Sequence, residues 1–266
     1  MNNFENELNN LKSLIEVESD EEEENLKSWI LMLGYNKCLE MRDNYISIIG
    51  EEQEKIPFKY LFTFSEYEYL LANVLFSLLR IQEDNVKAYL SNINIGKRIS
   101  IESRPSNYSK TKYYFLFPVY RGDNNSRYLH IRTNCSKGPV DYYHAIRSLD
   151  FGDVNLLFSH LSNSQIAAFS NNPEMISDLD RTRKLRNYVY HHNLLYSLGI
   201  SRLKQSIILL LKNIPSASLK HHFIDVINKL SYNESDNSYD DVAKKIAIHI
   251  DESDIKEIFS LTSLLK

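Results

Sequence analysis

The sequence predicts a mainly α-helical protein that carries a small β insertion. Hydrophobic residues make up 43% of the 266-residue chain, which is enough for a substantial core. The chain contains only seven glycines and six prolines, too few for the many tight turns of an all-β fold. Apolar residues recur at helical spacing along most of the chain but alternate with polar residues over residues 97–133. We therefore expect a helical appendage at residues 1–50 and an antiparallel helical domain at residues 51–266, with strands inserted at about 97–133.

The N-terminal appendage is predicted to consist of helices. Apolar residues at helical steps over residues 4–15 indicate a short amphipathic helix. The acidic run at residues 18–24 forms either a solvated linker or the negatively charged first turn of the next helix. Residues 26–49 have a helical pattern that Gly34 weakens. Such an appendage could pack on the core, mediate dimerisation or hold a partner.

A strong helical pattern covers residues 64–90 and predicts the first core helix of the larger domain. Ser65 and Glu68 have the spacing of a capping box at its start. Glu66 and Glu68 could face Arg186 across the helical bundle. The alternative, which we favour, is that these two acids cap or solvate their own helix.

The β insertion is expected to contain two or three strands. Residues 98–103 and 127–133 alternate apolar and polar side chains, and residues 112–120 are rich in tyrosine and phenylalanine. The turn-forming residues 121–126 indicate a hairpin. Aromatic and basic side chains are interleaved here and could stack bases and bind phosphates, or could be ordinary strand formers with solvated charges. These side chains are Lys112, Tyr113, Arg121, Arg127, His130 and Arg132.

The remainder of the chain is predicted to be helical. Short helices are expected over residues 139–147, 155–161 and 165–169, with breaks at Gly152 and at residues 171–173. Longer helices are expected from Ser177 or Asp178 to Leu198, and over residues 200–212, 219–230, 240–250 and 254–265. Ser253 is the expected cap of the last helix, and residues 232–239 the expected polar loop.

One stretch of the chain concentrates side chains that suit phosphodiester chemistry. Arg186, Asn187 and His191 place a permanent cation, an amide and a titratable imidazole within six residues. On a helix that continues to Gly199, Asn187 and His191 project from the same side. The predicted buried stripe of that helix consists of Leu185, Val189, His192 and Tyr196. We therefore expect His191 at the edge of the stripe, firmly held and within reach of solvent.

The run from Arg186 to Leu194 (RNYVYHHNL) resembles the R-x4-6-H motif of the HEPN superfamily, in its RN-x-x-x-H form. It looks most similar to the Abi-like (abortive infection) branch. Residues 149–158 (LDFGDVNLLF) are similar to the segment that precedes the motif helix in that branch. The two segments lie within about residues 140–200. HEPN toxins paired with nucleotidyltransferases carry a tyrosine two residues after the histidine. Asn193 stands at that position here, so the resemblance does not imply that mode of regulation.

The resemblance implies an HEPN-like helical bundle with metal-independent endoribonuclease activity, in which the RNA 2′-hydroxyl attacks the adjacent phosphate. His191 would act as base or acid, because imidazole exchanges protons near neutral pH. Arg186 would bind the phosphate through its planar guanidinium group. Asn187 would position the imidazole or a phosphate oxygen. The product would end in a 2′,3′-cyclic phosphate, and neither a metal nor a cofactor would be required.

One motif supplies too few groups for the whole reaction. HEPN proteins bring two motifs together across a dimer interface, so we expect a twofold homodimer across the motif helix, with His191 of each chain facing a shared cleft. Further contacts with RNA are expected from Tyr190, His192, Arg183 and Lys184. For His192 a core or hydrogen-bonded role is the alternative.

The expected role is cleavage of cellular or viral RNA, tRNA included, in abortive infection and antiphage defence or as a toxin. An antitoxin or a phage-derived trigger would control such an activity. One alternative is a non-catalytic HEPN module that binds RNA or a partner protein and uses Arg186 and His191 structurally. Another is a helical interaction protein that contains the motif by accident.

Charge and cysteine content restrict the remaining classes of function. The formal net charge is −4, but the segment 181–220 contains eight basic and no acidic residues, whereas residues 1–24 contain nine acidic residues and a single lysine. A polyanion would be attracted to the first segment and repelled by the second. The only two cysteines, Cys38 and Cys135, are too far apart in the sequence for a metal-binding motif. No signal peptide or membrane-spanning run is visible, so we expect a cytoplasmic protein.

Overall fold

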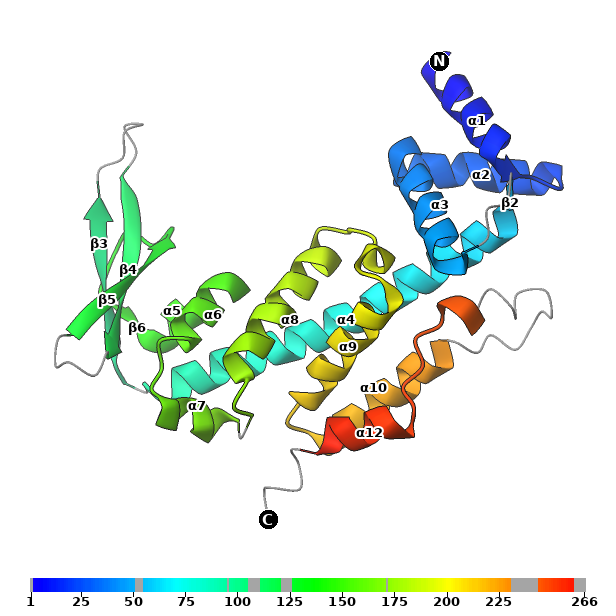
Figure 1. The fold of residues 1–266 in the computed structure, drawn as a ribbon. Helices are drawn as coiled ribbons and strands as arrows, with labels where there is room; N and C mark the ends of the chain where they lie inside the picture. Colours follow the sequence, from blue (N-terminus) through cyan, green and yellow to red (C-terminus); the bar gives the residue numbers. More distant parts are fainter. Residues whose placement is uncertain are drawn as a thin grey trace. The chain divides into compact units, whose positions relative to one another are not determined.

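The computed structural model describes residues 2–50, 55–94, 96–104, 111–120, 126–170, 172–230 and 244–260. Most of these residues lie in helices, and a four-stranded antiparallel sheet is inserted between α4 and α5 (Figure 1). The predicted fold class, mainly helical with a small β insertion, is confirmed. The chain forms two compact units. Unit 1 consists of Met1–Phe76, Tyr188–Ile208 and Ser216–Lys256, and unit 2 consists of Ser77–Asn187, Leu209–Pro215 and Glu257–Lys266.

Unit 1 begins with short helices and a pair of parallel strands. In chain order these elements are α1 (Asn2–Leu14), β1 (Ile15–Glu16), α2 (Asp20–Leu33), α3 (Tyr35–Ile49) and β2 (Ile56–Pro57). The sequence predicted one helix over residues 26–49, but Gly34 separates α2 from α3. Its φ angle of +85° lies in a region that glycine adopts without strain and that ends α2. Ser19 caps α2 by accepting a hydrogen bond from the backbone N–H of Glu22.

α4 (Phe58–Asn92) belongs to unit 1 up to Phe76 and to unit 2 from Ser77. It begins at Phe58, before the predicted start at residue 64. Ser65 and Glu68 therefore lie inside the helix, and the predicted capping box is wrong. The Ser65 hydroxyl instead accepts a hydrogen bond from the indole N–H of Trp29 at 3.2 Å.

Aromatic side chains form the centre of unit 1. Trp29 of α2 contacts Phe58 with ring centroids 5.8 Å apart, and Tyr45 of α3 contacts Phe64 at 5.9 Å. Phe64 in turn contacts Tyr196 at 4.9 Å. Such aromatic pairs add to the stability that burial provides. The N-terminal helices therefore pack on the rest of unit 1, and the domain boundary at residue 50 stays a prediction.

The later part of unit 1 departs from the predicted helices. Its described elements are η1 (Leu195–Leu198), most of α9 (Ile200–Lys212), α10 (Ala217–Leu230) and the first part of α12 (Glu252–Phe259). α9 enters unit 2 at Leu209, and α12 enters it at Glu257. Residues 247–250 are not helical, although a helix was predicted over residues 240–250. Their backbone is held by side chains instead, because Ile248 N–H donates to the Tyr67 hydroxyl at 2.7 Å and Ile250 N–H to the Asn228 side chain at 2.8 Å. The loop predicted at 232–239 lies outside the described residues.

The last helix, α12, is capped two residues earlier in the sequence than predicted. Asp251, and not Ser253, accepts hydrogen bonds from the backbone N–H groups of Ser253 and Asp254, at 2.8 and 3.1 Å. The helix therefore starts at Glu252. The predicted continuation over residues 261–265 lies outside the described residues.

Unit 2 contains the sheet, in the order β5-β4-β3-β6. Its strands are β3 (Arg98–Arg104), β4 (Lys112–Tyr120), β5 (Ser126–Thr133) and β6 (Val140–Asp141). The three predicted strands are confirmed, whereas β6 falls in a segment predicted as helix. One face of the sheet buries Ile99, Phe115, Phe117 and Ile131 in a core shared with α5 and α6. Of the turn predicted at residues 121–126, residues 121–125 lie outside the described residues, and Ser126 is the first residue of β5.

Besides the part of α4 from Ser77 onward, four further helices among the described residues lie wholly or mostly in unit 2. They are α5 (Tyr142–Arg147), α6 (Phe151–Phe158), α7 (Asn163–Phe169) and α8 (Met175–Tyr190), the last of which extends into unit 1. The predicted break at Gly152 is wrong, since Gly152 lies inside α6. The side chain of Asp150 caps α6 by accepting a hydrogen bond from the Asp153 N–H at 2.9 Å, and the helix therefore starts before the predicted residue 155.

Substitution of Ser162 by alanine is expected to destabilise the protein by about 1 kcal/mol. Ser162 and Gln165 form a capping box at the start of α7, in which each side chain accepts a hydrogen bond from the backbone of the other. Chemical denaturation of the parent and the variant measures the difference. Ser164→Ala is the matched control, because Ser164 is the exposed neighbour of the cap and bonds only to the Ser162 hydroxyl. Equal stability of Ser162→Ala and parent would contradict the prediction.

Candidate active site

The motif helix α8 starts before the predicted capping residues. It begins at Met175, and the turn in front of it is built by Asn172. The Asn172 side chain accepts a hydrogen bond from the Glu174 N–H at 3.0 Å and donates one to the Asp178 carboxylate at 2.6 Å. Asp178 is buried, so it anchors the first turn from inside unit 2 and does not cap the helix.

α8 ends at Tyr190, inside the predicted motif helix, which was expected to continue to Leu198. His192 has a φ of 52°, in the left-handed region. The His192 N–H donates to the Val189 carbonyl at 3.3 Å and the Asn193 N–H to the Tyr188 carbonyl at 3.0 Å. These two bonds make a Schellman motif, in which His192 occupies the position that glycine usually takes. His191 is therefore the residue that caps the end of the helix.

This helix end changes the expected geometry of the motif. Leu185, Val189 and Tyr196 are buried as predicted, but His192 is exposed and does not belong to the stripe. His191 is the C-cap of α8 and not a residue within a longer helix, and its projection from the same side as Asn187 stays a prediction. Its side chain is exposed, and within the described part of the chain no hydrogen bond, ion pair or ring contact involves it.

The other two motif residues lie within α8. Arg186 and Asn187 are half-buried and belong to unit 2, whereas His191 belongs to unit 1. None of the three side chains is fully buried, so solvent reaches each of them. Of the three residues, only His191 is exposed, and the Nε atom of Arg186 is buried.

The predicted cationic contacts, Arg183 and Lys184, are engaged with a carboxylate on their own helix. Arg183 Nη2 lies 2.8 Å from Asp180 Oδ1, and Lys184 Nζ lies 3.0 Å from Asp180 Oδ2. Hydrogen bonds from Arg183 and then Lys184 hold the pKa of Asp180 below its usual value. Exposed pairs of this kind contribute little to stability.

Tyr190 stacks on a neighbouring aromatic ring in unit 1. The Tyr190 and Phe76 rings lie 4.7 Å apart with an interplanar angle of 23°. Phe76 is 41% exposed, and Tyr190 is half-buried. The last residue of α8 thus places a partly open aromatic pair directly before His191 in the chain.

Two residues hold the segment after the motif. Sequence analysis did not connect Lys37 with the motif, and it placed Glu68 either opposite Arg186 or as a capping or solvated residue of its own helix. Lys37 of α3 donates a hydrogen bond to the His192 carbonyl at 2.5 Å. Glu68 of α4 accepts a hydrogen bond from the backbone N–H of Leu195, at the start of η1. Burial raises the pKa of Glu68 to about 7, and the hydrogen bond from Leu195 only partly offsets that effect. Glu66, by contrast, is exposed.

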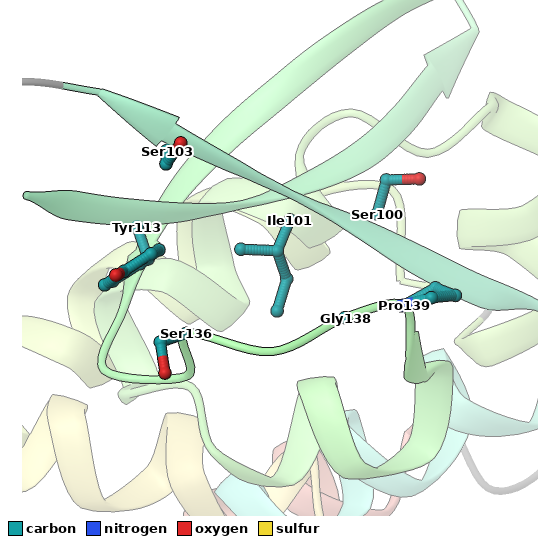
Figure 2. Close-up of a pocket in the computed structure, with 7 residues that line it drawn as sticks. All are labelled: Ser100, Ile101, Ser103, Tyr113, Ser136, Gly138 and Pro139. Carbon is teal, nitrogen blue, oxygen red and sulfur yellow. The ribbon is translucent and has the colours of Figure 1, made fainter.

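A pocket lies elsewhere, on the sheet of unit 2. Its volume is about 340 Å³, and hydroxyl groups of Ser100, Ser103, Tyr113 and Ser136 contribute to its lining. Figure 2 shows Ile101 above the loop that carries Gly138. The approach is close, because a Cβ added at Gly138 would lie 3.0 Å from Ile101 Cγ1. The lining contains no charged side chain and no residue of the motif helix, but it includes Tyr113, one of the side chains of the β insertion that could contact nucleic acid.

The chain matches no family model, no curated protein and no solved structure in the comparisons made with each. The described residues contain no group of three or more His, Cys, Asp or Glu side chains placed to hold a metal ion. Nor does any helix among the described residues combine the length and apolar character needed to cross a membrane.

Proposed function

We propose that the protein is a metal-independent endoribonuclease of the HEPN type, with Arg186, Asn187 and His191 as its catalytic residues. The observation that carries this proposal is the position of His191. Its imidazole is exposed on a turn that two backbone hydrogen bonds and Lys37 hold in place. A titratable group that is both accessible and well held meets the first requirement of general acid–base catalysis.

The proposed reaction is intramolecular transfer within RNA. His191 takes the proton of a 2′-hydroxyl, whose oxygen attacks the adjacent phosphorus and displaces the 5′-oxygen of the next nucleotide. A second acid protonates that leaving oxygen, and the 2′,3′-cyclic phosphate remains on the upstream fragment. Arg186 stabilises the charge that accumulates on the phosphate, because its guanidinium can donate two hydrogen bonds at once. Asn187 orients the phosphate or the imidazole.

A second copy of the chain would supply the acid that one motif lacks. In a twofold homodimer across the motif helix, His191 of one protomer serves as base and that of its partner as acid. The partly open Tyr190–Phe76 pair offers a ring on which a base could stack. The role proposed for such an enzyme is abortive infection or growth arrest. Its substrate would be RNA such as tRNA, and an antitoxin or a phage product would regulate its activity.

A non-catalytic module that binds RNA or a protein is the second candidate. The pairing of Arg183 and Lys184 with Asp180 favours it, because those cations already have a structural partner. Under this proposal expression of the protein does not inhibit growth through RNA cleavage, and purified protein leaves RNA intact.

The purified protein is expected to cleave RNA in excess EDTA as fast as in its absence, because the proposed mechanism uses only protein groups. The fragments should end in 2′,3′-cyclic phosphates, which sequencing of the cleavage ends after acid or phosphatase treatment identifies. RNA in which the 2′-hydroxyls are methylated is the control substrate and should stay intact. Cleavage that EDTA abolishes, or that yields 3′-hydroxyl ends, would contradict the proposed chemistry.

A further inference from the structure

The outer face of the sheet in unit 2 carries a different set of side chains from its inner face. Alternation along β3, β4 and β5 places the buried residues on the inner face, toward α5 and α6. The opposite face carries Ser100, Glu102 and Arg104 on β3, Lys112, Tyr114, Leu116 and Pro118 on β4, and Tyr128, His130 and Arg132 on β5. Among the described elements, β6 is the only neighbour of β3 on the side away from β4.

The aromatic and charged groups on this outer face are in direct contact. The Arg104 guanidinium lies over the Tyr114 ring, 5.3 Å from its centroid. Arg104 Nη2 also lies 2.9 Å from Glu102 Oε2 and 2.6 Å from His130 Nδ1. The carboxylate of Glu102 thus holds Arg104 and His130 in place beside the Tyr114 ring, with His130 Nδ1 at 2.9 Å.

A second tyrosine extends the surface along the sheet. Tyr128 is 54% exposed on β5 and pairs with Pro118, whereas Tyr114 pairs with Arg132. The two tyrosines are therefore about 13 Å apart along the strand direction. Rings at this separation on one face can stack bases that are not neighbours in a bound strand.

We propose that this outer face binds single-stranded RNA, with bases stacked on Tyr114 and Tyr128 and phosphates held by Arg104 and Arg132. The choice of RNA over other nucleic acids rests on the proposed function. Basic side chains outnumber the single acidic one, Glu102, among the residues of β3, β4 and β5 on this face. Aromatic rings interleaved with cations suit an unpaired strand, because a duplex keeps its base faces stacked inside.

The composition of the face also argues against a protein as its ligand. The core of a protein interface is depleted in charged residues. Here the charged side chains of Glu102, Arg104 and Arg132 surround Tyr114, and Leu116, which lies between the two tyrosines, is half-buried. The basic side chains and tyrosine rings therefore favour a polyanion that carries unpaired bases.

The test measures binding of a short fluorescent oligouridine to full-length protein carrying His191→Ala, so that the probe stays intact. Adding Tyr114→Ala and Tyr128→Ala is expected to weaken binding at least about tenfold, from the loss of two stacking rings. Adding Tyr69→Ala instead should leave the affinity unchanged, since Tyr69 lies on α4 in unit 1 and is not part of the sheet, although at 69% it is even more exposed than Tyr128. Duplex RNA of the same length should bind more weakly than the single-stranded oligouridine.

A second pair of changes, Tyr128→Ala with Arg132→Gln, guards against misfolding, because both side chains are exposed. The inference would be overturned if both sheet variants bound the oligouridine as tightly as the Tyr69→Ala control does. It would also be overturned if the protein bound duplex RNA more tightly than the single strand. The result is separable from the proposed function. If the tyrosine substitutions weaken RNA binding but the parent protein never cleaves RNA, only the proposed ribonuclease activity is refuted. If the parent cleaves RNA but the substitutions do not weaken binding, only the proposed binding face is refuted.

Discussion

Replacement of His191 by alanine is expected to slow RNA cleavage by about 10²–10⁴-fold. The imidazole is the proposed acid–base group, and in a homodimer a single substitution removes both copies of it. Because His191 is exposed and takes part in no hydrogen bond, ion pair or ring contact within the described residues, the variant should fold and dimerise like the parent. Single-turnover cleavage of a labelled RNA, with protein in excess, isolates the chemical step from product release.

The matched control is His249→Ala, which removes another exposed histidine of unit 1. Its cleavage rate should equal that of the parent. Arg186→Ala should resemble His191→Ala in the same assay, because the guanidinium is the proposed phosphate ligand. The proposal would fail if His191→Ala cleaved RNA at the parental rate, or if its expression inhibited growth as strongly as the parent does.

The sequence located the motif and its buried neighbours but not the shape of the helix end. Leu185 and Val189 are buried as their spacing predicted. The end of α8 was missed because the rule for helix termini looks for glycine, and Gly199 seemed to provide it. The left-handed position is occupied by His192 instead, a residue type that only occasionally adopts it. A histidine at that position carries no signal that separates it from a helical residue.

The contacts that hold the motif turn could not be predicted because they join segments far apart in the chain. Lys37 reaches the His192 carbonyl across 155 residues, and Glu68 reaches the Leu195 N–H across 127. Local patterns suggested a capping role for Glu68, and only the packing of α4 in unit 1 places its carboxylate at η1. The strands were easier to predict, because alternation along β3 and β5 is a local property. β6 is only two residues long, too short to produce a pattern.

Replacement of Glu68 by glutamine is expected to remove a pH-dependent loss of stability of about 3 kcal/mol. Burial raises the pKa of Glu68 to about 7 from the ordinary 4.5, so the folded protein favours the protonated carboxyl. A raised folded-state pKa gives a stabilising contribution that is complete below about pH 4.5. That contribution is lost as pH rises through about 7, where the carboxylate must ionise inside unit 1. Glutamine can still accept the Leu195 hydrogen bond but does not ionise.

The measurement is the free energy of unfolding from urea titrations between pH 5 and pH 8, compared between parent and variant. Taking the difference cancels the titration of all other groups, including Asp180. Glu68→Gln should gain stability relative to the parent as pH rises, whereas Glu66→Gln, at an exposed position two residues earlier, should show a constant difference. A pH-independent difference for Glu68→Gln would mean that the carboxylate is ionised in the folded protein throughout this range. Water or a cation would then have to stabilise the ionised Glu68 carboxylate where it contacts Leu195.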